Sequence, residues 1–315
     1  MSRLLEWKEQ IGTPDHYDFP RERKLVKRLS SEECECELYL QSNGIRPDGT
    51  VTFQRLVLAF PKQFEGTLPA VAVPFYYPEA ALGFEIETGN ILSQFANNTT
   101  MLDIVRHGYI AASADAYHLT YVEKELRDDS QDFARWEIAS EALNAEHPEW
   151  SGIGKLVADT KLVIDALEED PRVDADRIGI AGHSLGGKMA FYTGCLDERV
   201  KVILASDFGF CWEQTNWDAP WYWGNKLQTL KEIGLEHTSL LAAAAPKPFC
   251  LLAGEADNEE SRKRIYSVPG YEAEPSRILV VDHRSGHRPP KYAAEAGYCF
   301  LDYWLKTRSL KDVAF

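Results

Sequence analysis

The sequence predicts an α/β fold built on a mostly parallel sheet with helices on both faces. Three observations carry this prediction. From about residue 69 to the C-terminus, apolar strand-like runs alternate with stretches of helical periodicity, as expected when helical crossovers join parallel strands. The run at 69–77 is almost unbroken in apolar character, which is typical of a strand covered on both faces. Turn residues at 42–49 separate two earlier strand-like runs and indicate an antiparallel hairpin.

The composition of the chain indicates which partners and which cellular compartment to expect. The 315 residues carry a formal net charge of -15, spread along the chain, and such a charge repels nucleic acids and anionic membranes, so we expect neither as a partner. The N-terminal residues lack the apolar run of a signal peptide, and no stretch reaches the ~18 apolar residues of a membrane span. Together with six cysteines, which fit a reducing compartment, this predicts a cytoplasmic protein. The oligomeric state stays open.

The chain divides into a short N-terminal part and one large domain. We expect residues 1–30 to form an exposed helix or arm, because they are rich in charged side chains. Residues 31–315 are expected to form a single domain, since no linker or low-complexity run interrupts them. The predicted strands are 34–41, 50–60, 69–77, 108–114, 177–181, 200–205, 248–253 and 278–281, the first two forming a hairpin at the edge of the sheet. Helices are predicted at 100–106, 155–169, after Ser184 and at 291–307.

Two segments, 115–151 and 208–238, are longer than ordinary connections. Both are expected to leave the carboxyl edge of the sheet, where active sites of such folds lie, and we interpret them as lid or pocket-forming insertions. Aromatic rings in the second insertion either stack on a sugar or aromatic substrate or form the insertion's own core, the second being more common. These rings are Trp212, Trp217, Trp221, Tyr222 and Trp223.

A glycine-serine-glycine motif follows the predicted strand at 177–181. The residues Gly182-His183-Ser184-Leu185-Gly186 lead directly into a helical pattern. A serine on such a sharp turn has its hydroxyl pushed out of the sheet, and the flanking glycines leave room for the turn. Ser184 is therefore the candidate nucleophile.

Later strand ends supply the residue types that a serine nucleophile needs. A serine hydroxyl is weakly nucleophilic at neutral pH, so it requires a neighbouring base and a carboxylate that orients this base. Asp257 follows the strand at 248–253, and His287 follows the strand at 278–281. The chain order Ser184, Asp257, His287 is the one found when a strand-to-helix serine motif carries a catalytic triad.

Several motifs carry a resemblance to a known family. They are Arg177-Ile-Gly-Ile-Ala-Gly-His-Ser-Leu-Gly-Gly187, Ala245-Pro-Lys-Pro248 before Leu251-Leu-Ala-Gly-Glu-Ala-Asp257, Ser285-Gly-His287, and Val105-Arg-His-Gly-Tyr-Ile110. With these motifs the chain resembles the α/β-hydrolase superfamily, and within it the esterase branch around acetylxylan esterases and dienelactone-hydrolase-like proteins. The resemblance implies the fold of that superfamily and a carboxylic-ester hydrolase that uses neither a metal nor an organic cofactor.

The acid and the base each have competitors. The resemblance favours Asp257, because Gly-x-x-Asp after this strand is the family habit, over Glu255 on the same loop and over Asp207, which follows the preceding strand at a position that some relatives use. It favours His287, which matches the family's Gly-His, over His283. A histidine at a strand end, such as His283, is often only packed or hydrogen-bonded there.

The resemblance also implies an oxyanion hole with two donors. The amide of Leu185 is one, helped by its place at a helix N-terminus. Many relatives carry glycines after the third strand, whereas this chain has Phe75-Tyr76-Tyr77-Pro78. The second donor is then the backbone N–H of Tyr77, aligned with a tyrosine of acetylxylan esterases, or the phenol of Tyr76 or Tyr77, as in prolyl-oligopeptidase-like and cocaine-esterase-like enzymes. Both tyrosines can instead be core aromatics.

We therefore expect a serine hydrolase that cleaves carboxylic esters, with short-chain acyl or acetyl esters of carbohydrates as candidate substrates. Activity should fall as the pH drops through a histidine pKa, because the base must be neutral. The alternatives are a prolyl-oligopeptidase-like peptidase and a non-catalytic ligand-binding protein of the same fold. The first usually carries a propeller, which the sequence does not resemble, and the second usually loses a member of the triad.

Overall fold

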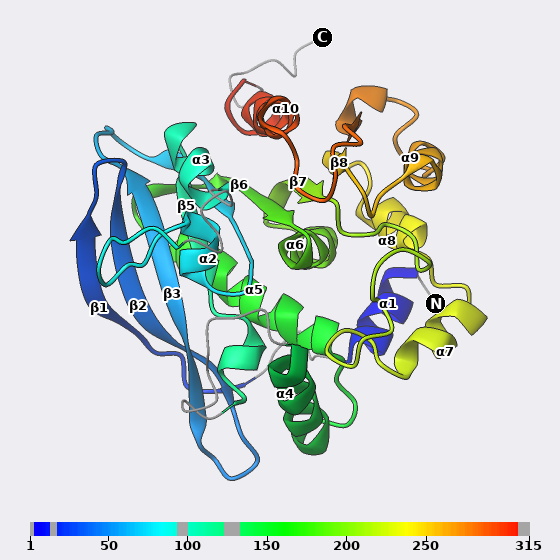
Figure 1. Cartoon of the computed structure of the whole chain (residues 1–315), viewed down its shortest axis with the longest axis horizontal. Coiled ribbons are helices and arrows are strands. Elements are labelled where there is room, and N and C mark those ends of the chain that lie inside the picture. Colours follow the sequence, from blue (N-terminus) through cyan, green and yellow to red (C-terminus); the bar gives the residue numbers. More distant parts are fainter. Residues whose placement is uncertain (1–2, 13–17, 93–99, 123–132, 308–315) are drawn as a thin grey trace.

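A computed structural model describes residues 3–12, 18–92, 100–122 and 133–307 (Figure 1). Within these residues one 9-stranded sheet runs in the order β1-β2-β3-β5-β4-β6-β7-β8-β9. The strands are β1 (Arg23–Ser30), β2 (Cys34–Ile45), β3 (Val51–Pro61), β4 (Leu68–Ala72), β5 (Ile110–Ala114), β6 (Val173–His183), β7 (Val200–Ser206), β8 (Phe249–Ala253) and β9 (Ile278–Asp282).

Helices connect these strands. They are α1 (Arg3–Ile11), α2 (Pro78–Leu82), α3 (Thr100–Arg106), α4 (Phe133–Glu146), α5 (Gly152–Glu169), α6 (Leu185–Leu196), α7 (Lys226–Glu232), α8 (His237–Ala244), α9 (Glu259–Tyr266) and α10 (Lys291–Asp302). There are also short 3-10 helices at η1 (Tyr117–Leu119) and η3 (Pro275–Arg277) and a π-helical segment at η4 (Tyr303–Thr307). No helix within the described ranges is long and apolar enough to cross a membrane.

The sheet is mostly parallel, as predicted. From β5 to β9 every neighbouring pair is parallel, whereas β1, β2, β3 and β5 pair in antiparallel fashion. The predicted hairpin is present as β2 and β3, but its place at the sheet edge is wrong, because β1 pairs with β2 and takes the edge. The charged run of β1 belongs to an edge strand, where charged side chains discourage pairing with another chain.

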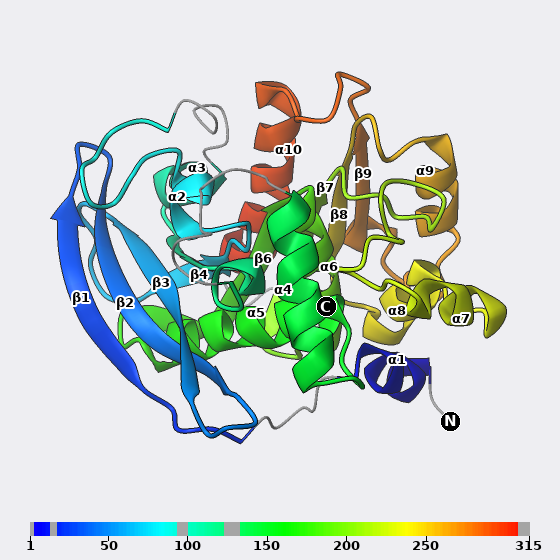
Figure 2. The same cartoon turned by 60° about the horizontal axis from the view of Figure 1, so that its bottom comes forward.

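Most of the described residues of 1–30 are exposed or partly exposed, but α1 is docked on the rest of the protein. A helix is present there as α1, but its Trp7 is fully buried, and the Trp7 indole donates a 2.9 Å hydrogen bond to Ser239 Oγ on α8. Figures 1 and 2 both show α1 beside α8. The helix is amphipathic, so its apolar side needs a partner, and α8 supplies it.

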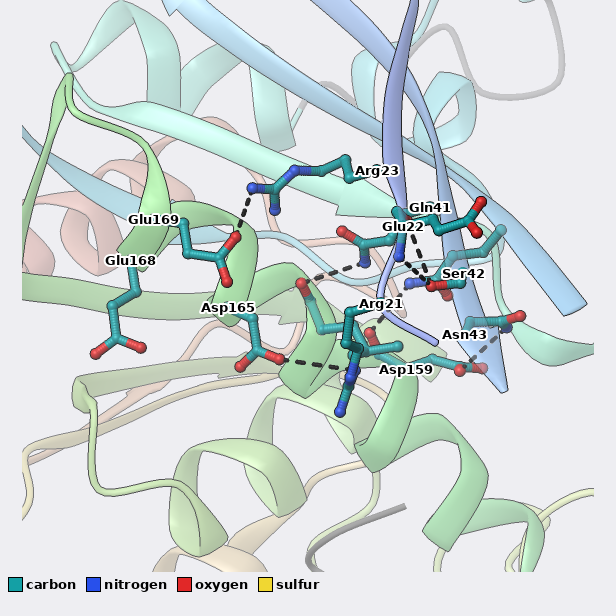
Figure 3. A network of polar contacts seen from close by, with 12 residues as sticks. Arg21, Glu22, Arg23, Gln41, Ser42, Asn43, Asp159, Asp165, Glu168 and Glu169 are labelled. Atoms are coloured by element: carbon teal, nitrogen blue, oxygen red, sulfur yellow. Dashed lines mark hydrogen bonds and ion pairs between the residues drawn. The ribbon is translucent and has the colours of Figure 1, made fainter. Parts of the chain in front are cut away.

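Polar contacts fix the segment that leads into β1 (Figure 3). The backbone of Glu22 exchanges hydrogen bonds with Ser42 of β2, since the Glu22 amide donates to Ser42 Oγ and the Ser42 amide donates to the Glu22 carbonyl, each at 2.8 Å. Arg23 pairs with Glu169 of α5 at 2.7 Å. Asn43 donates to Asp159 in the middle of α5 at 3.2 Å. Hydrogen bonds and an ion pair thus hold residues 22–23 against both β2 of the sheet and α5.

Helices cover both faces of the sheet, as predicted. One face packs against α3 and α10, and the other packs against α5, α6 and α8. Figure 2 shows α10 and α5 on opposite sides of the central strands. The long helix α5 begins where Ser151 Oγ accepts a 2.9 Å hydrogen bond from the Gly154 amide, which satisfies one of the free amides of its first turn.

β4 is shorter than the predicted strand at 69–77. It ends at Ala72, and α2 begins at Pro78, where proline is favoured because the first helical residue needs no N–H. Residues 73–77 therefore form a connection above the carboxyl end of the sheet. This connection is the predicted source of the second oxyanion donor.

The two predicted insertions differ in content. Residues 123–132 of the first lie outside the described residues, and the rest of it contains η1 and α4. The second forms a long loop and α7, and ends at α8. Its aromatic rings are the insertion's own core, since even the most exposed of the five, Trp221, is only 7% exposed. Trp7 of α1 joins them, with its ring 6.2 Å from those of Trp212 and Trp223.

Candidate active site

Ser184 lies at a strained turn between β6 and α6. Its φ is 56° and its ψ is -115°, a backbone conformation that costs a non-glycine residue about 1–3 kcal/mol. The Ser184 amide donates a 2.8 Å hydrogen bond to the Ser206 carbonyl at the end of β7. The turn is thus anchored to the neighbouring strand, and the predicted strand-turn-helix setting of Ser184 is present.

The flanking glycines are required by close backbone contacts. A Cβ on Gly182 would lie 2.1 Å from the Gly186 carbonyl oxygen, and a Cβ on Gly186 would lie 2.2 Å from the Pro74 carbonyl oxygen. No side chain fits at either place, because real Cβ atoms do not approach backbone so closely. The second contact also shows that the connection after β4 passes directly beside the serine turn.

His287 pairs with Asp207. The two atoms His287 Nδ1 and Asp207 Oδ2 lie 2.7 Å apart, with the Asp207 side chain fully buried and the His287 side chain 45% exposed. Asp207 directly follows β7, and His287 follows β9. A buried carboxylate on Nδ1 fixes the ring and leaves Nε2 as the atom that can take a proton.

Backbone amides surround the Asp207 carboxylate. Amides of the loop after β8 donate to it at 2.9 to 3.2 Å, namely those of Gly254, Glu255, Ala256 and Asp257. Burial alone would raise the pKa of Asp207, but the hydrogen bonds from His287 and these amides lower it below the usual value. Asp207 is therefore held as an anion.

The prediction that Asp257 orients the histidine is wrong. Its carboxylate is also buried, but it accepts hydrogen bonds from the amides of Phe208, Gly209 and Phe210 and from the Ser261 hydroxyl, at 2.6 to 3.0 Å. Each aspartate thus accepts hydrogen bonds from backbone amides of the other aspartate's loop. Asp207 binds amides of the loop after β8, and Asp257 binds amides of the loop after β7. This exchange turns the Asp257 side chain toward residues 208–210, and Asp207 takes the place beside His287. Burial raises the pKa of Asp257.

The other competitors lie elsewhere. Glu255 is exposed to solvent on its loop. His283 is buried, and its Nδ1 accepts a 3.2 Å hydrogen bond from the Ser285 amide. Burial also lowers the pKa of His283. A buried histidine occupied by its own turn is poorly placed to exchange protons with a substrate, whereas His287 is open to solvent.

The predicted oxyanion donors lie around the serine turn. Leu185 is the first residue of α6, so its amide has no acceptor within the helix. Tyr77 is buried in extended conformation just before α2. Tyr76 is partly buried among Phe75, His118 and Trp136, and burial raises the pKa of its phenol to about 12. Which of the two tyrosines supplies the second donor stays a prediction.

Two further residues, His183 and Lys188, lie beside the site. The ring of His183 lies 4.6 Å from the ring of His287, its Nδ1 lies 3.1 Å from Ser206 Oγ, and burial lowers its pKa to about 3. Lys188 is buried one turn after Ser184, and its ammonium donates to the Phe208 carbonyl and to Thr215 Oγ1. The position of Lys188 four residues after the serine was the available signal, since it places both on one side of α6.

No metal centre emerges from the part of the chain that the structure describes, where no three His, Cys, Asp or Glu side chains gather in a way that could hold an ion.

Parts of the sequence are similar to known proteins. Residues 149–233 match the family described as glucuronyl esterase, fungi. Over 183 residues the chain is 26% identical to YtaP of Bacillus subtilis (strain 168), covering 55% of this chain and 60% of that protein. The chain spans between 16% and 60% of the length of the curated relatives it matches.

Solved structures cover more of the chain. A glucuronoyl esterase from Solibacter usitatus superposes with a TM-score of 0.71 at 14% identity, covering 95% of this chain and 90% of that one. The chain has the α/β-hydrolase fold. An acetyl xylan esterase from Paenibacillus sp. R4 superposes with a TM-score of 0.56 at 17% identity, covering 96% of this chain and 99% of that one. The predicted α/β-hydrolase fold is confirmed, and the similarity to glucuronoyl and acetyl xylan esterases is consistent with the predicted resemblance to the esterase branch.

Proposed function

We propose that this α/β-hydrolase is a serine esterase that cleaves carboxylic esters of carbohydrates. The observation that carries the proposal is the pair of His287 and the buried Asp207 at the sheet edge that also bears the strained Ser184. The carbohydrate part is supported by the similarity to glucuronoyl and acetyl xylan esterases.

In the proposed reaction the Ser184 hydroxyl attacks the ester carbonyl while His287 Nε2 takes its proton. Asp207 stays ionised, holds the imidazole through Nδ1 and stabilises the imidazolium that forms. The Leu185 amide and a donor from Tyr76 or Tyr77 would stabilise the negative oxygen of the tetrahedral intermediate. His287 then returns the proton to the leaving alcohol, and water hydrolyses the acyl-serine by the same steps in reverse order.

The test is hydrolysis of 4-nitrophenyl acetate and of acetylated xylo-oligosaccharides by wild type and Ser184→Ala. We expect the variant to lose at least about 10³-fold in kcat, as is typical when a triad member is removed. A serine-directed fluorophosphonate should label wild type, and the label should map to Ser184. Equal ester hydrolysis by both proteins would overturn the proposal, and cleavage of aminoacyl anilides alone would favour the peptidase. Binding of an ester without turnover would favour the ligand-binding alternative.

We also propose a cytoplasmic location. It is supported by the six free cysteines, of which five are buried, with Cys34 Sγ and Cys36 Sγ lying 3.6 Å apart. Separation of cell fractions followed by detection of the native protein tests it, and recovery of the protein outside the cell would overturn it.

A further inference from the structure

A cavity of about 350 Å³ lies beside the serine turn, between α3 and α10. His183 forms part of its wall, together with Thr100 and Asp103 of α3 and with residues at and before the start of α10. His183 precedes the candidate nucleophile, and its ring lies 4.6 Å from that of His287. A group in this cavity would therefore be close to an ester bound at Ser184.

Each acidic side chain of this cavity already has a polar side chain close to it. Asp103 pairs with Arg106 at 2.8 Å. Glu295 lies 3.3 Å from His107 Nε2. The negative charge of Asp103 is therefore partly neutralised by an arginine.

Two cationic side chains of the same wall have no charged partner among the described residues. Arg288 directly follows His287, Lys291 begins α10, and both are exposed. Across the described ranges of the chain, neither side chain has a hydrogen bond or an ion pair. Two unpaired cations thus line one small cavity next to the candidate base.

This local charge contrasts with the rest of the protein. The chain has a formal net charge of -15, and such a field lowers the local concentration of anionic ligands. Two cations beside the site that have no partner in the described part of the chain would offset the repulsion of an anionic ligand at this place. Arginine matches the two oxygens of a carboxylate, and lysine adds a mobile point charge.

We propose that this cavity binds a carboxylate carried by the ester substrate, so that the enzyme prefers esters of acidic molecules to neutral esters of similar size. The inference rests on the proposed function, since it concerns the same site. His183 adds a polar but uncharged wall, and the carboxylate would reach Arg288 and Lys291 while the ester lies at Ser184.

The experiment compares matched esters. Mono-4-nitrophenyl succinate against 4-nitrophenyl butyrate places the carboxylate on the acyl side, and 4-acetoxybenzoate against phenyl acetate places it on the alcohol side. The readout is the ratio of kcat/KM for the charged ester to that for the neutral one. In at least one pair we expect Arg288→Gln with Lys291→Gln to lower this ratio roughly tenfold, a change of about 1.4 kcal/mol, and Arg288→Glu to lower it further. Added salt should reduce the wild-type ratio.

Lys24→Gln is the matched control, because it removes one exposed cation from β1, away from the site. Its ratio should equal that of wild type. A ratio that the Arg288 and Lys291 variants leave unchanged in both pairs overturns this inference while the esterase proposal stands. Ester hydrolysis that Ser184→Ala does not reduce overturns the proposed function instead, so the two failures are distinguishable.

Discussion

Replacing Asp207 and Asp257 separately by asparagine tests which carboxylate serves His287. In Asp207, Oδ1 accepts hydrogen bonds from the amides of Gly254, Ala256 and Asp257, whereas Oδ2 accepts from the Glu255 amide and faces His287 Nδ1. The oxygen of an asparagine would stay with the three amides at Oδ1, so its NH₂ group would face His287 and the Glu255 amide. It would then donate to Nδ1 and leave the proton on Nε2, where the base must be free. The equivalent change in serine proteases lowers kcat about 10⁴-fold, and we expect about 10³ to 10⁴ here.

Asp257→Asn should behave differently. Its Oδ1 accepts from the Phe210 amide and the Ser261 hydroxyl, and its Oδ2 accepts from the amides of Phe208 and Gly209. An asparagine NH₂ at the Oδ1 position would face the Phe210 N–H, so two donors would point at each other. The Ser261 hydroxyl would not add a second clash, because it can rotate and accept a hydrogen bond from the NH₂ group. One buried donor without an acceptor costs about 1–3 kcal/mol of stability. We expect kcat per folded molecule to stay within about tenfold of wild type, since neither oxygen touches the base.

The assay is 4-nitrophenyl acetate hydrolysis at pH 8, with urea denaturation giving the folded fraction of each variant. Wild-type-like kcat in Asp207→Asn would refute the assignment of this residue. An equal loss in both variants, after correction for folding, would refute the claim that Asp257 acts only on the loop.

Three further outcomes follow from buried contacts. Gly186→Ala should lower the free energy of unfolding by about 1–3 kcal/mol or more and impair labelling of Ser184, because its Cβ would lie 2.2 Å from the Pro74 carbonyl oxygen. Gly66→Ala is the comparison, because its Cβ would meet nothing within 4 Å and only its left-handed backbone, with a φ of 69°, opposes a side chain. A urea midpoint of Gly186→Ala no lower than that of Gly66→Ala would contradict the reasoning. Trp7→Ala should lower the free energy of unfolding measured in urea by about 3–5 kcal/mol, since the ring is fully buried. A loss below about 1 kcal/mol would mean that the packing of α1 contributes little to stability. Burial lowers the pKa of His237 to about 3, so below pH 6.5 the unfolded state binds a proton at this residue that the folded state does not. This residue alone should lower the free energy of unfolding by up to about 1.4 kcal/mol per pH unit. His237→Gln should make the decline between about pH 6.5 and 4.5 less steep by that amount, and an unchanged slope would contradict the reasoning.

The parts of the fold and site that were predicted are those fixed by local pattern. The strand, sharp turn and helix around Ser184 follow from apolar residues on either side of closely spaced glycines. A histidine after the last strand was predicted from its position, and the match of Gly286-His287 to the family pattern selected His287 over His283. Both signals lie within a few residues of the side chain concerned, so they are visible in the sequence.

The parts that were missed depend on contacts between distant segments. Asp207 and Asp257 each follow a strand of the same edge, and nothing in either loop tells which carboxylate faces the histidine. That choice is made by which amides the opposite loop presents. The burial of Trp7 is similar, because a charged N-terminal helix gives no sign that α8, more than 200 residues later, covers its apolar side.

The exchange of amides between the loops after β7 and β8 has a consequence for local opening. If residues 208–210 move away, the Asp257 carboxylate loses the backbone amides that donate to it. If residues 254–257 move away, the Asp207 carboxylate loses its amide donors in the same way. Opening either loop alone would leave an unsolvated charge in the other, so the two should open together as one cooperative unit. In hydrogen exchange under native conditions, the amides of both loops should share one opening free energy, and removal of either carboxylate should speed the exchange of both.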